Sequence, residues 1–366
     1  SSVRLNLSSI TREFSKKENK LDLSFLDIAT ALLICVSGLA VATLALGLFN
    51  PKFVVVVTLL LFCGVAYLAG DRLRVAPFEW KSFWLVLTLL LTGFMFRAEP
   101  FHYVAGGQDQ GVYVSMSKHF ERTGEVFYTD QVRAGLPEQL KEAYDSQNYE
   151  IQSKPWWVEG KKEGYFWPGL YLKDQDKSQH VFQFYHLHPL WMGIFGDIFG
   201  NDYRFYSLTF FSLFSIFVFY ALARELSGSK ALGFVAGAIL AVNPLHVFFS
   251  KWPVAEVVAL TFSLTSLYYL LRFYKSSRSN DYRPVFLMVS ALAMGCMFFT
   301  RITGFMYLPF FYLLLISVEL YARDNLLRTQ FRWYVAGVFL LYGLSVLYGL
   351  TYSYPYATDI YRISFA

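Results

Sequence analysis

The sequence predicts an all-α polytopic membrane protein with about nine transmembrane helices and a long extracytoplasmic loop that carries interfacial helices. Two observations support this fold class. Hydrophobic residues make up 55% of the 366 residues and charged residues only 16%, whereas a soluble domain carries roughly 25% charged residues. The apolar residues are also gathered into runs long enough to cross a bilayer, which takes about 20 residues for a helix.

Nine spans follow from these runs, and the third and seventh must recruit flanking residues to reach the needed length. The spans cover residues 28–49, 52–70, 82–96, 206–223, 231–249, 254–272, 284–300, 303–320 and 333–351. We divide the chain into a basic segment (1–27), two additional spans (28–81), a transmembrane module (82–351) that contains the loop 97–205, and a tail (352–366).

The distribution of charge predicts the orientation. Basic residues precede the first span and follow the second, fourth, sixth and eighth spans. The short loops of the opposite side hold Lys52, Lys251, Arg301 and Arg362. Loops rich in Lys and Arg stay in the cytoplasm, so we expect a cytoplasmic N-terminus and an extracytoplasmic loop 97–205 and tail. The membrane would be a plasma or inner membrane, or the ER membrane of a eukaryote.

Composition also bears on other classes of protein. The basic excess outside the loop fits contact with anionic lipids better than nucleic-acid binding. The three cysteines, Cys35, Cys63 and Cys296, lie within apolar runs and provide no disulfide or metal framework. The chain starts without Met and stops soon after a span, so we expect a processed or partial chain.

The loop opens with a helix predicted from Asp109 to Gly124. Its apolar face, at helical spacing, consists of Val112, Tyr113, Met116 and Phe120. We expect this helix to lie on the membrane surface. Asp109 has two interpretations: an N-cap or first-turn acid stabilised by the helix dipole, or a general base that activates an acceptor. Gly106 and Gly107 would let the backbone approach a substrate closely.

The middle of the loop, residues 130–180, is polar with clustered aromatic residues. Such aromatic residues anchor a loop at the lipid interface or stack on sugar rings. Asp174 and Asp176 have the spacing of a metal–nucleotide motif. A short charged turn is the simpler interpretation, because the outside compartment lacks nucleotide sugars.

Two histidines, His186 and His188, close the loop before a second interfacial helix. In an extended segment they would lie on the same side, and Pro189 disfavours helix at His188. They are interface histidines or contacts to a phosphate, a sugar or a metal ion. No cofactor is certain from the sequence. A divalent metal ion is left open, because two histidines and a carboxylate could bind zinc, although the spacing supports this only weakly.

Three charged residues flank later spans on the same side. Glu256 begins a span, where a charge is costly in lipid and so marks a functional candidate, unless it only caps the helix. Arg301 lies between two spans, where a guanidinium suits a lipid phosphate or a head-group anchor. Lys251 allows the same two interpretations.

In this order, the motifs resemble the GT-C superfamily of glycosyltransferases that use polyprenyl-phosphate sugars. The nearest branch is the protein mannosyltransferase and lipid A aminoarabinose transferase type. The motifs are Asp109-Gln110-Gly111-Val112-Tyr113, His186-Leu187-His188-Pro189-Leu190, Tyr203-Arg204-Phe205-Tyr206-Ser207, and Ala241-Val242-Asn243-Pro244 followed by Glu256. The resemblance covers residues 82–320. The two spans within residues 28–70 precede the family's usual first span and look like an addition. Any large soluble domain after the last span is absent here.

The resemblance implies transfer of a sugar from a polyprenyl-phosphate donor to an acceptor hydroxyl, with inversion at the anomeric carbon. In the family the first-loop Asp activates the acceptor, which implies that role for Asp109. The family's basic residue in a Lys-Pro-Pro-Leu-like segment contacts the donor phosphate. Leu187 and His188 depart from that form, so His186 or His188 would take this part.

The expected site therefore has two groups of residues. Asp109 and Glu256 are the catalytic group, with Glu256 positioning the acceptor or a second proton. The residues expected to bind donor or substrate are Tyr113, His186, His188, Lys251 and Arg301. Expected partners are the polyprenyl-phosphate sugar, an acceptor lipid, glycan or protein, and membrane lipids, without nucleic acid; other membrane subunits are left open.

Two other functions stay open. One is a catalytically inactive GT-C-like subunit that scaffolds a membrane assembly. The other is a lipid transporter or flippase, which would carry charges or broken helices deep in several spans. The spans here are mostly free of charge, which favours the enzyme.

Overall fold

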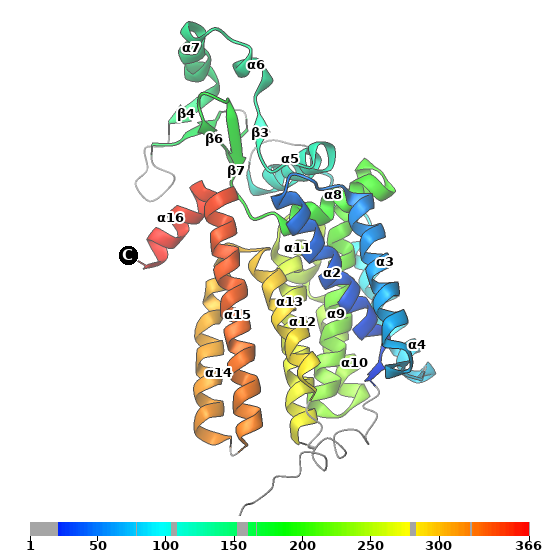
Figure 1. Ribbon diagram of the computed structural model, residues 1–366. Helices are drawn as coiled ribbons and strands as arrows, with labels where there is room; N and C mark the ends of the chain where they lie inside the picture. The colour runs from blue at the N-terminus through cyan, green and yellow to red at the C-terminus, as the bar shows by residue number, and fades with distance from the viewer. Residues whose placement is uncertain are drawn as a thin grey trace, which may run out of the picture.

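The protein is a bundle of long helices with a smaller cap of helices and strands at one end (Figure 1). The computed structural model describes residues 21–77, 79–103, 108–151, 160–165, 167–278, 283–322 and 324–365. The bundle helices are α2 (Phe25–Ala45), α3 (Pro51–Ala69), α4 (Trp80–Arg97), α9 (Tyr206–Ser227), α10 (Lys230–Val242), α11 (Pro244–Lys251), α12 (Glu256–Arg278), α13 (Pro284–Phe298), α14 (Leu308–Tyr321) and α15 (Asn325–Tyr352).

Helices occupy all nine predicted spans, and the helical, multi-pass membrane fold class is confirmed. Within the described residues, six helices are long and apolar enough to cross a membrane, or seven if the bent pair α10 and α11 forms one span. Helix α4 is not among the six, and α13 has only 15 residues. The count of nine spans is therefore not confirmed.

The predicted fifth span, 231–249, is broken between α10 and α11, which meet at 56°. Pro244 has no N–H to continue the hydrogen-bond ladder of α10, and its ring clashes with the preceding turn. A new helix starts there because Pro suits the first helical position, and the Asn243 side chain caps it by accepting from the His246 N–H at 3.0 Å.

Small and polar side chains join the bundle helices. On α12, the hydroxyls of buried Thr261 and Thr265 donate hydrogen bonds to carbonyls of their own helix. Ser266 bonds Ser290 of α13 at 3.0 Å. Such residues allow close helix approach and satisfy one another where lipid offers no hydrogen bonds.

Helix α2, one of the two spans expected to be an addition to the family's pattern, is hydrogen-bonded to other helices at its start and near its middle. Its Asp27 accepts hydrogen bonds from Tyr269, at 2.7 Å, and from Arg272 of α12. Near its middle, Ser37 accepts from the indole N–H of Trp191 at 3.0 Å. The division of the chain at residue 81 stays a prediction.

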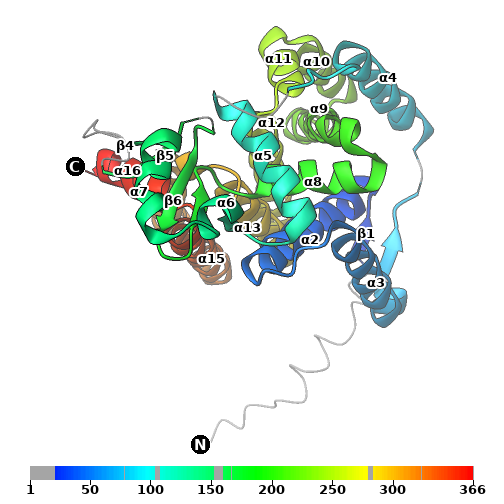
Figure 2. The same cartoon turned by 90° about the horizontal axis from the view of Figure 1, so that it is seen from above.

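The cap consists of the segment between α4 and α9, and we call this end of the bundle the loop side. Helices α5 (Gln108–Thr123) and α8 (Leu187–Phe199) lie lengthwise across the bundle when it is seen from above (Figure 2). The predicted apolar face of the first helix is buried, and Phe120 packs edge-on against the His186 ring. Gly124 ends α5 with φ +71°, as its predicted role at the C-terminus requires.

A small subdomain stands on this platform, where the sequence predicts only polar loop. A five-stranded antiparallel sheet has the order β3-β7-β6-β5-β4 and is accompanied by helices α6 (Gln131–Ala134) and α7 (Glu138–Asn148). The strands are β3 (Tyr128–Thr129), β4 (Tyr149–Ile151), β5 (Lys162–Gly164), β6 (Leu170–Asp174) and β7 (Gln179–Phe182). At the opposite end of the bundle, β1 (Leu21–Leu23) and β2 (Leu73–Val75) pair in parallel.

A buried ion pair holds the subdomain together. The Arg133 guanidinium donates to both carboxylate oxygens of Asp145, at 2.7 and 3.0 Å, and Lys162 joins at 2.9 Å. Burial alone would raise the pKa of the Asp145 carboxyl, but the hydrogen bonds and charges of Arg133 and Lys162 hold it below its ordinary value. Asp145 therefore stabilises the subdomain above the ordinary Asp pKa, and this contribution is lost as pH falls through the lowered pKa.

Replacing Asp145 by Asn should destabilise the subdomain selectively. The buried Arg133 charge would lose its partner, which costs roughly 3–5 kcal/mol in buried pairs. Hydrogen–deuterium exchange should speed up in α6, α7 and the sheet while the bundle stays protected. Glu142→Gln on the exposed face of α7 is the matched control and should leave exchange unchanged. Equal exchange in the two variants would contradict this account.

Candidate functional site

A small polar cavity on the loop side collects residues from five parts of the chain. Its lining consists of Asp109, Tyr113, Phe184, Tyr185, Val254, Glu256, Thr300, Arg301, Ile302 and Tyr356. We call it the polar chamber; its volume is about 50 Å³. Two helices, α5 and α12, begin at this chamber with Gln108 and Glu256. Their N-terminal ends carry the positive pole of the helix dipole, which favours anionic groups there.

Glu256 and Arg301 form an ion pair in the wall of the chamber. The Arg301 Nη1 donates to Glu256 Oε1 at 2.7 Å, and each side chain is about one third exposed (34% and 35%). Within the described residues, the second Glu256 oxygen, Oε2, is buried and accepts no hydrogen bond. A buried carboxylate oxygen without a donor is costly, so this atom is suited to receive a polar group from a ligand.

Asp109 lies in the first turn of α5 and not at the N-cap, because the helix begins one residue earlier. Partial burial raises the pKa of its carboxyl, and the negative charge of Glu256 raises it further, while Arg301 acts in the opposite direction. The three charged side chains thus lie close enough to affect one another. The predicted glycines Gly106 and Gly107 lie outside the described residues.

Tyr113 follows Asp109 by one helical turn, so both side chains lie on the same face of α5. Its ring stacks on Phe184 with 4.7 Å between centroids and meets His188 edge-on at 4.9 Å. Phe184 in turn packs edge-on against Tyr356 at 5.3 Å. Burial raises the pKa of the Tyr113 hydroxyl well above its ordinary value, so this group stays protonated and can only donate or accept as a phenol.

The two predicted histidines do not line the chamber. His186 bonds Tyr348 at 2.5 Å and Ser353 at 3.3 Å. His188 lies behind Tyr113, near the Pro253 carbonyl, and neither ring nitrogen makes a hydrogen bond of normal geometry within the described residues. Burial lowers the pKa of both rings to about 3. Both are therefore neutral at physiological pH, and their contact with donor phosphate stays a prediction.

Two further predictions concern Lys251 and a metal ion. Lys251 ends α11 and lies over the Phe101 ring, 5.3 Å from its centroid, outside the chamber lining. In the described part of the chain, no group of three or more His, Cys, Asp or Glu side chains could hold a metal ion. The donor role of Lys251 stays a prediction, and the metal site that was left open has no support from these residues.

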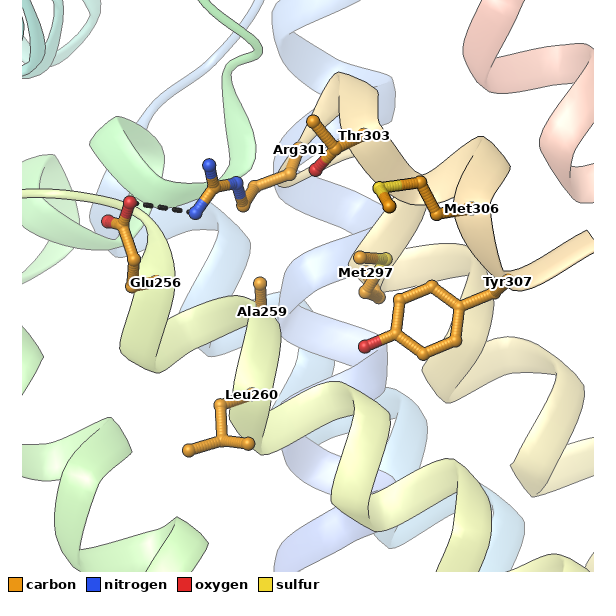
Figure 3. Close-up of a pocket in the computed structure, with 8 residues that line it drawn as sticks. All are labelled: Glu256, Ala259, Leu260, Met297, Arg301, Thr303, Met306 and Tyr307. Atoms are coloured by element: carbon orange, nitrogen blue, oxygen red, sulfur yellow. Dashed lines mark hydrogen bonds and ion pairs between the residues drawn. The ribbon is translucent and has the colours of Figure 1, made fainter. Parts of the chain in front are cut away.

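A larger, mostly apolar cavity of about 400 Å³ meets the chamber at the ion pair (Figure 3). We call it the apolar cleft. Its lining consists of Glu256, Ala259, Leu260, Met297, Arg301, Thr303, Met306 and Tyr307. In Figure 3, Glu256 and Arg301 point toward each other at one end, and the apolar side chains extend away from them along α12 and the segment before α14. The ion pair is thus a wall shared by a polar and an apolar space.

Sequence reasoning missed Tyr356 and Tyr185 in the chamber wall. The predicted tail is a helix, α16 (Tyr354–Phe365), whose Ala357 packs with Tyr185 and Ile302. Gly349 of α15 permits this packing, because a Cβ there would collide with the Tyr185 ring. The tyrosines of this segment were the available signal, but only the fold shows that Tyr356 reaches the chamber.

The two histidines provide a matched test of this geometry. His186→Phe removes two hydrogen bonds and should destabilise the protein by about 1–3 kcal/mol. His188→Phe exchanges an unpaired buried ring for an apolar one and should change stability little. Thermal unfolding of both variants in the same detergent compares them. Greater destabilisation by His188→Phe than by His186→Phe would contradict the assignment.

Comparison with known proteins bears on the same region. Residues 195–361 match the family described as dolichyl-phosphate-mannose-protein mannosyltransferase. One similar solved structure is the archaeal oligosaccharyltransferase AglB from Archaeoglobus fulgidus, solved with an inhibitory peptide and a dolichol-phosphate. It has 12% identity and a TM-score of 0.46 over 77% of this chain, and the match spans only 33% of the AglB chain. No curated protein matches the chain. The family match, which includes Glu256, Arg301 and Tyr356, confirms the resemblance to the GT-C superfamily of membrane glycosyltransferases.

Proposed function

We propose that this protein is a membrane glycosyltransferase that moves a sugar from a polyprenyl-phosphate donor to an acceptor hydroxyl, with Asp109 as the base. The observation that carries this proposal is the junction of two cavities at the Glu256–Arg301 pair. A polyprenyl-phosphate sugar has an apolar chain, an anionic phosphate and a polar sugar. The cleft, the guanidinium and the chamber offer matching surroundings in the same order.

Arg301 is the proposed phosphate contact. A guanidinium stays charged and matches phosphate geometry with paired N–H donors. Among the described residues, its side chain makes one hydrogen bond, to Glu256, so further N–H groups are free to bind a ligand. Glu256 orients the guanidinium, and its Oε2 can accept a hydrogen bond from the sugar or the acceptor.

Asp109 is the proposed base on the opposite side of the chamber. The acceptor oxygen attacks the anomeric carbon while its proton passes to the Asp109 carboxylate. The bond between the anomeric carbon and the phosphate oxygen breaks, and the electron pair leaves with the polyprenyl phosphate, whose charge Arg301 stabilises. Attack opposite the leaving group inverts the anomeric configuration. A raised pKa improves Asp109 as a base near neutral pH.

The side of the membrane and the partners belong to the same proposal. The positive-inside rule supports a cytoplasmic N-terminus and an extracytoplasmic chamber. The chamber then faces a compartment without nucleotide sugars, where a lipid carrier is the available donor. The family match supports dolichyl- or other polyprenyl-linked sugars as donors. The acceptor is a hydroxyl on a lipid, a glycan or a protein.

Asp109→Asn should abolish transfer while the protein folds normally. The amide keeps the shape of the carboxylate but cannot take the acceptor proton. The assay uses purified protein with defined polyprenyl-phosphate sugars and a panel of acceptors, and thermal unfolding checks the fold. Glu125→Gln, just beyond α5 and outside the chamber lining, is the control and should retain activity. Full transfer by the Asp109 variant would rule out its role as base.

Neutralising Glu256 and neutralising Arg301 should shift the pH dependence of transfer in opposite directions. Transfer needs ionised Asp109, so the rate falls as pH drops through its pKa. Because the charge of Glu256 raises that pKa and the charge of Arg301 lowers it, Glu256→Gln should move the acid limb of kcat/KM to lower pH. Arg301→Gln should move it to higher pH.

Arg301→Lys, which keeps the positive charge, is the control for the pH profiles and should leave the limb near its original position. If the two neutral variants moved the limb in the same direction, Asp109 would not be the group that titrates.

A further inference from the structure

A buried arginine at the end of α4 lies outside the site described above. The Arg97 side chain is fully buried (0% exposed), and within the described residues no carboxylate forms an ion pair with it. An ionised side chain inside a membrane protein is costly and commonly marks a functional element.

Arg97 is compensated by hydrogen bonds that reach three other helices. Its Nη1 donates to the Gly93 and Ala241 carbonyls, each at 2.8 Å, and its Nε donates to Ser212 Oγ. Its Nη2 lies 2.7 Å from Nδ1 of His246. Residues of α4, α9, α10 and α11 thus meet at one guanidinium. We call these contacts the Arg97 cluster.

The donors and acceptors of the cluster determine the state of His246. Arginine has only donors, so His246 Nδ1 must accept and carry no proton. Its Nε2 therefore carries the proton and donates to Ser215 Oγ at 3.0 Å. The Ser215 hydroxyl donates in turn to the Ser212 carbonyl at 2.7 Å. His246 is a neutral acceptor with a defined tautomer, and the chain of bonds is complete.

The Ala241 carbonyl explains why a cation is needed here. It belongs to the last turn of α10, where carbonyls lose their helical partners and the negative pole of the helix dipole lies. Pro244 prevents the chain from continuing as one helix. Arg97 satisfies this carbonyl and, with another nitrogen, bonds His246 in the first turn of α11. It therefore holds both sides of the 56° break.

Both chain segments that leave the cluster lead to the polar chamber. After α11, residues 252–255 connect directly to Glu256. After α4, the Phe101 N–H bonds the Lys251 carbonyl at 3.0 Å before the chain continues to Asp109. His246 and Glu256 also line one cavity of about 250 Å³ between α10, α11 and α12.

We propose that Arg97 is a positioning residue that fixes the α10–α11 break and thereby places Glu256, and with it Arg301, relative to Asp109. It contacts no ligand itself. The effect on catalysis rests on the proposed transferase function, but the effect on the break does not. A small displacement of groups around a reacting centre costs on the order of 10²-fold in rate.

The test combines a distance measurement with kinetics. Spin labels at the exposed positions Leu232 on α10 and Leu245 on α11, with the three cysteines replaced, report the distance across the break. Arg97→Lys keeps the charge but has one nitrogen, which cannot reach Ser212, Ala241 and His246 together. We expect a broader distance distribution and a loss of kcat on the order of 10²-fold, with the donor KM nearly unchanged.

Variants of His246 separate the hydrogen bond from simple packing. His246→Gln keeps an acceptor for Arg97 and should preserve a narrow distribution and most of kcat. His246→Leu removes the acceptor and should behave like Arg97→Lys. Arg224→Lys, a substitution of the same type at a partly exposed ion pair with Glu79, is the matched control and should match the original protein.

The outcomes distinguish the two proposals. A narrow, unshifted distance in both Arg97→Lys and His246→Leu overturns the positioning role, whatever the protein catalyses. A broadened distance with unchanged kcat also overturns it, because the break would then not affect the site. If the original protein transfers no sugar, the proposed function fails, and the distance measurement alone decides whether Arg97 holds the break.

Discussion

The ion pair between Glu256 and Arg301 is the contact on which the site depends. It joins the first residue of α12 to the turn before α14, at 2.7 Å, and it belongs to the walls of both the polar chamber and the apolar cleft. Without Glu256, the Arg301 charge would lack its partner in the wall; without Arg301, two carboxylates would face each other across a small cavity. The Glu256–Arg301 pair allows one cation and two anions, the second anion being Asp109, to lie together where the apolar cleft meets the polar chamber.

The placement of this pair is a property of helix ends. Helices α5 and α12 both begin at the chamber, so acidic residues in their first turns are stabilised by the helix dipoles. The break between α10 and α11 precedes the start of α12, and it exposes the Ala241 carbonyl, which the Arg97 guanidinium satisfies. The same physical requirement, partners for backbone groups away from water, therefore shapes the bundle and the chamber together.

Much of the bundle could be predicted because apolar runs and their flanking charges carry a strong signal. Asp109, Glu256 and Arg301 were found as charged residues beside spans, and the structure brings all three to one chamber. The break in the predicted span 231–249 had a signal as well, since Pro244 interrupts the apolar pattern. The small sheet had little signal, because its strands are two to five residues long and rich in polar residues.

Other parts of the site depend on contacts that no local pattern contains. Tyr356 reaches the chamber from a segment that looks like a tail, across more than two hundred residues from Asp109. His186 and His188 look equivalent in sequence, but only His186 has hydrogen-bond partners among the described residues. The partners of Arg97 include a carbonyl of α10, and a carbonyl is present at every residue, so sequence alone cannot single it out.

The most direct test of the central claim is a cryo-EM structure of the Asp109→Asn variant with a non-reactive polyprenyl-phosphonate sugar. The account predicts a phosphonate oxygen about 3 Å from the Arg301 guanidinium. The polyprenyl chain of the ligand should lie in the apolar cleft beside Ala259 and Met306, and its anomeric carbon should face residue 109. A head group bound at the opposite end of the bundle, or in the cavity beside His246 and away from Arg301, would contradict it.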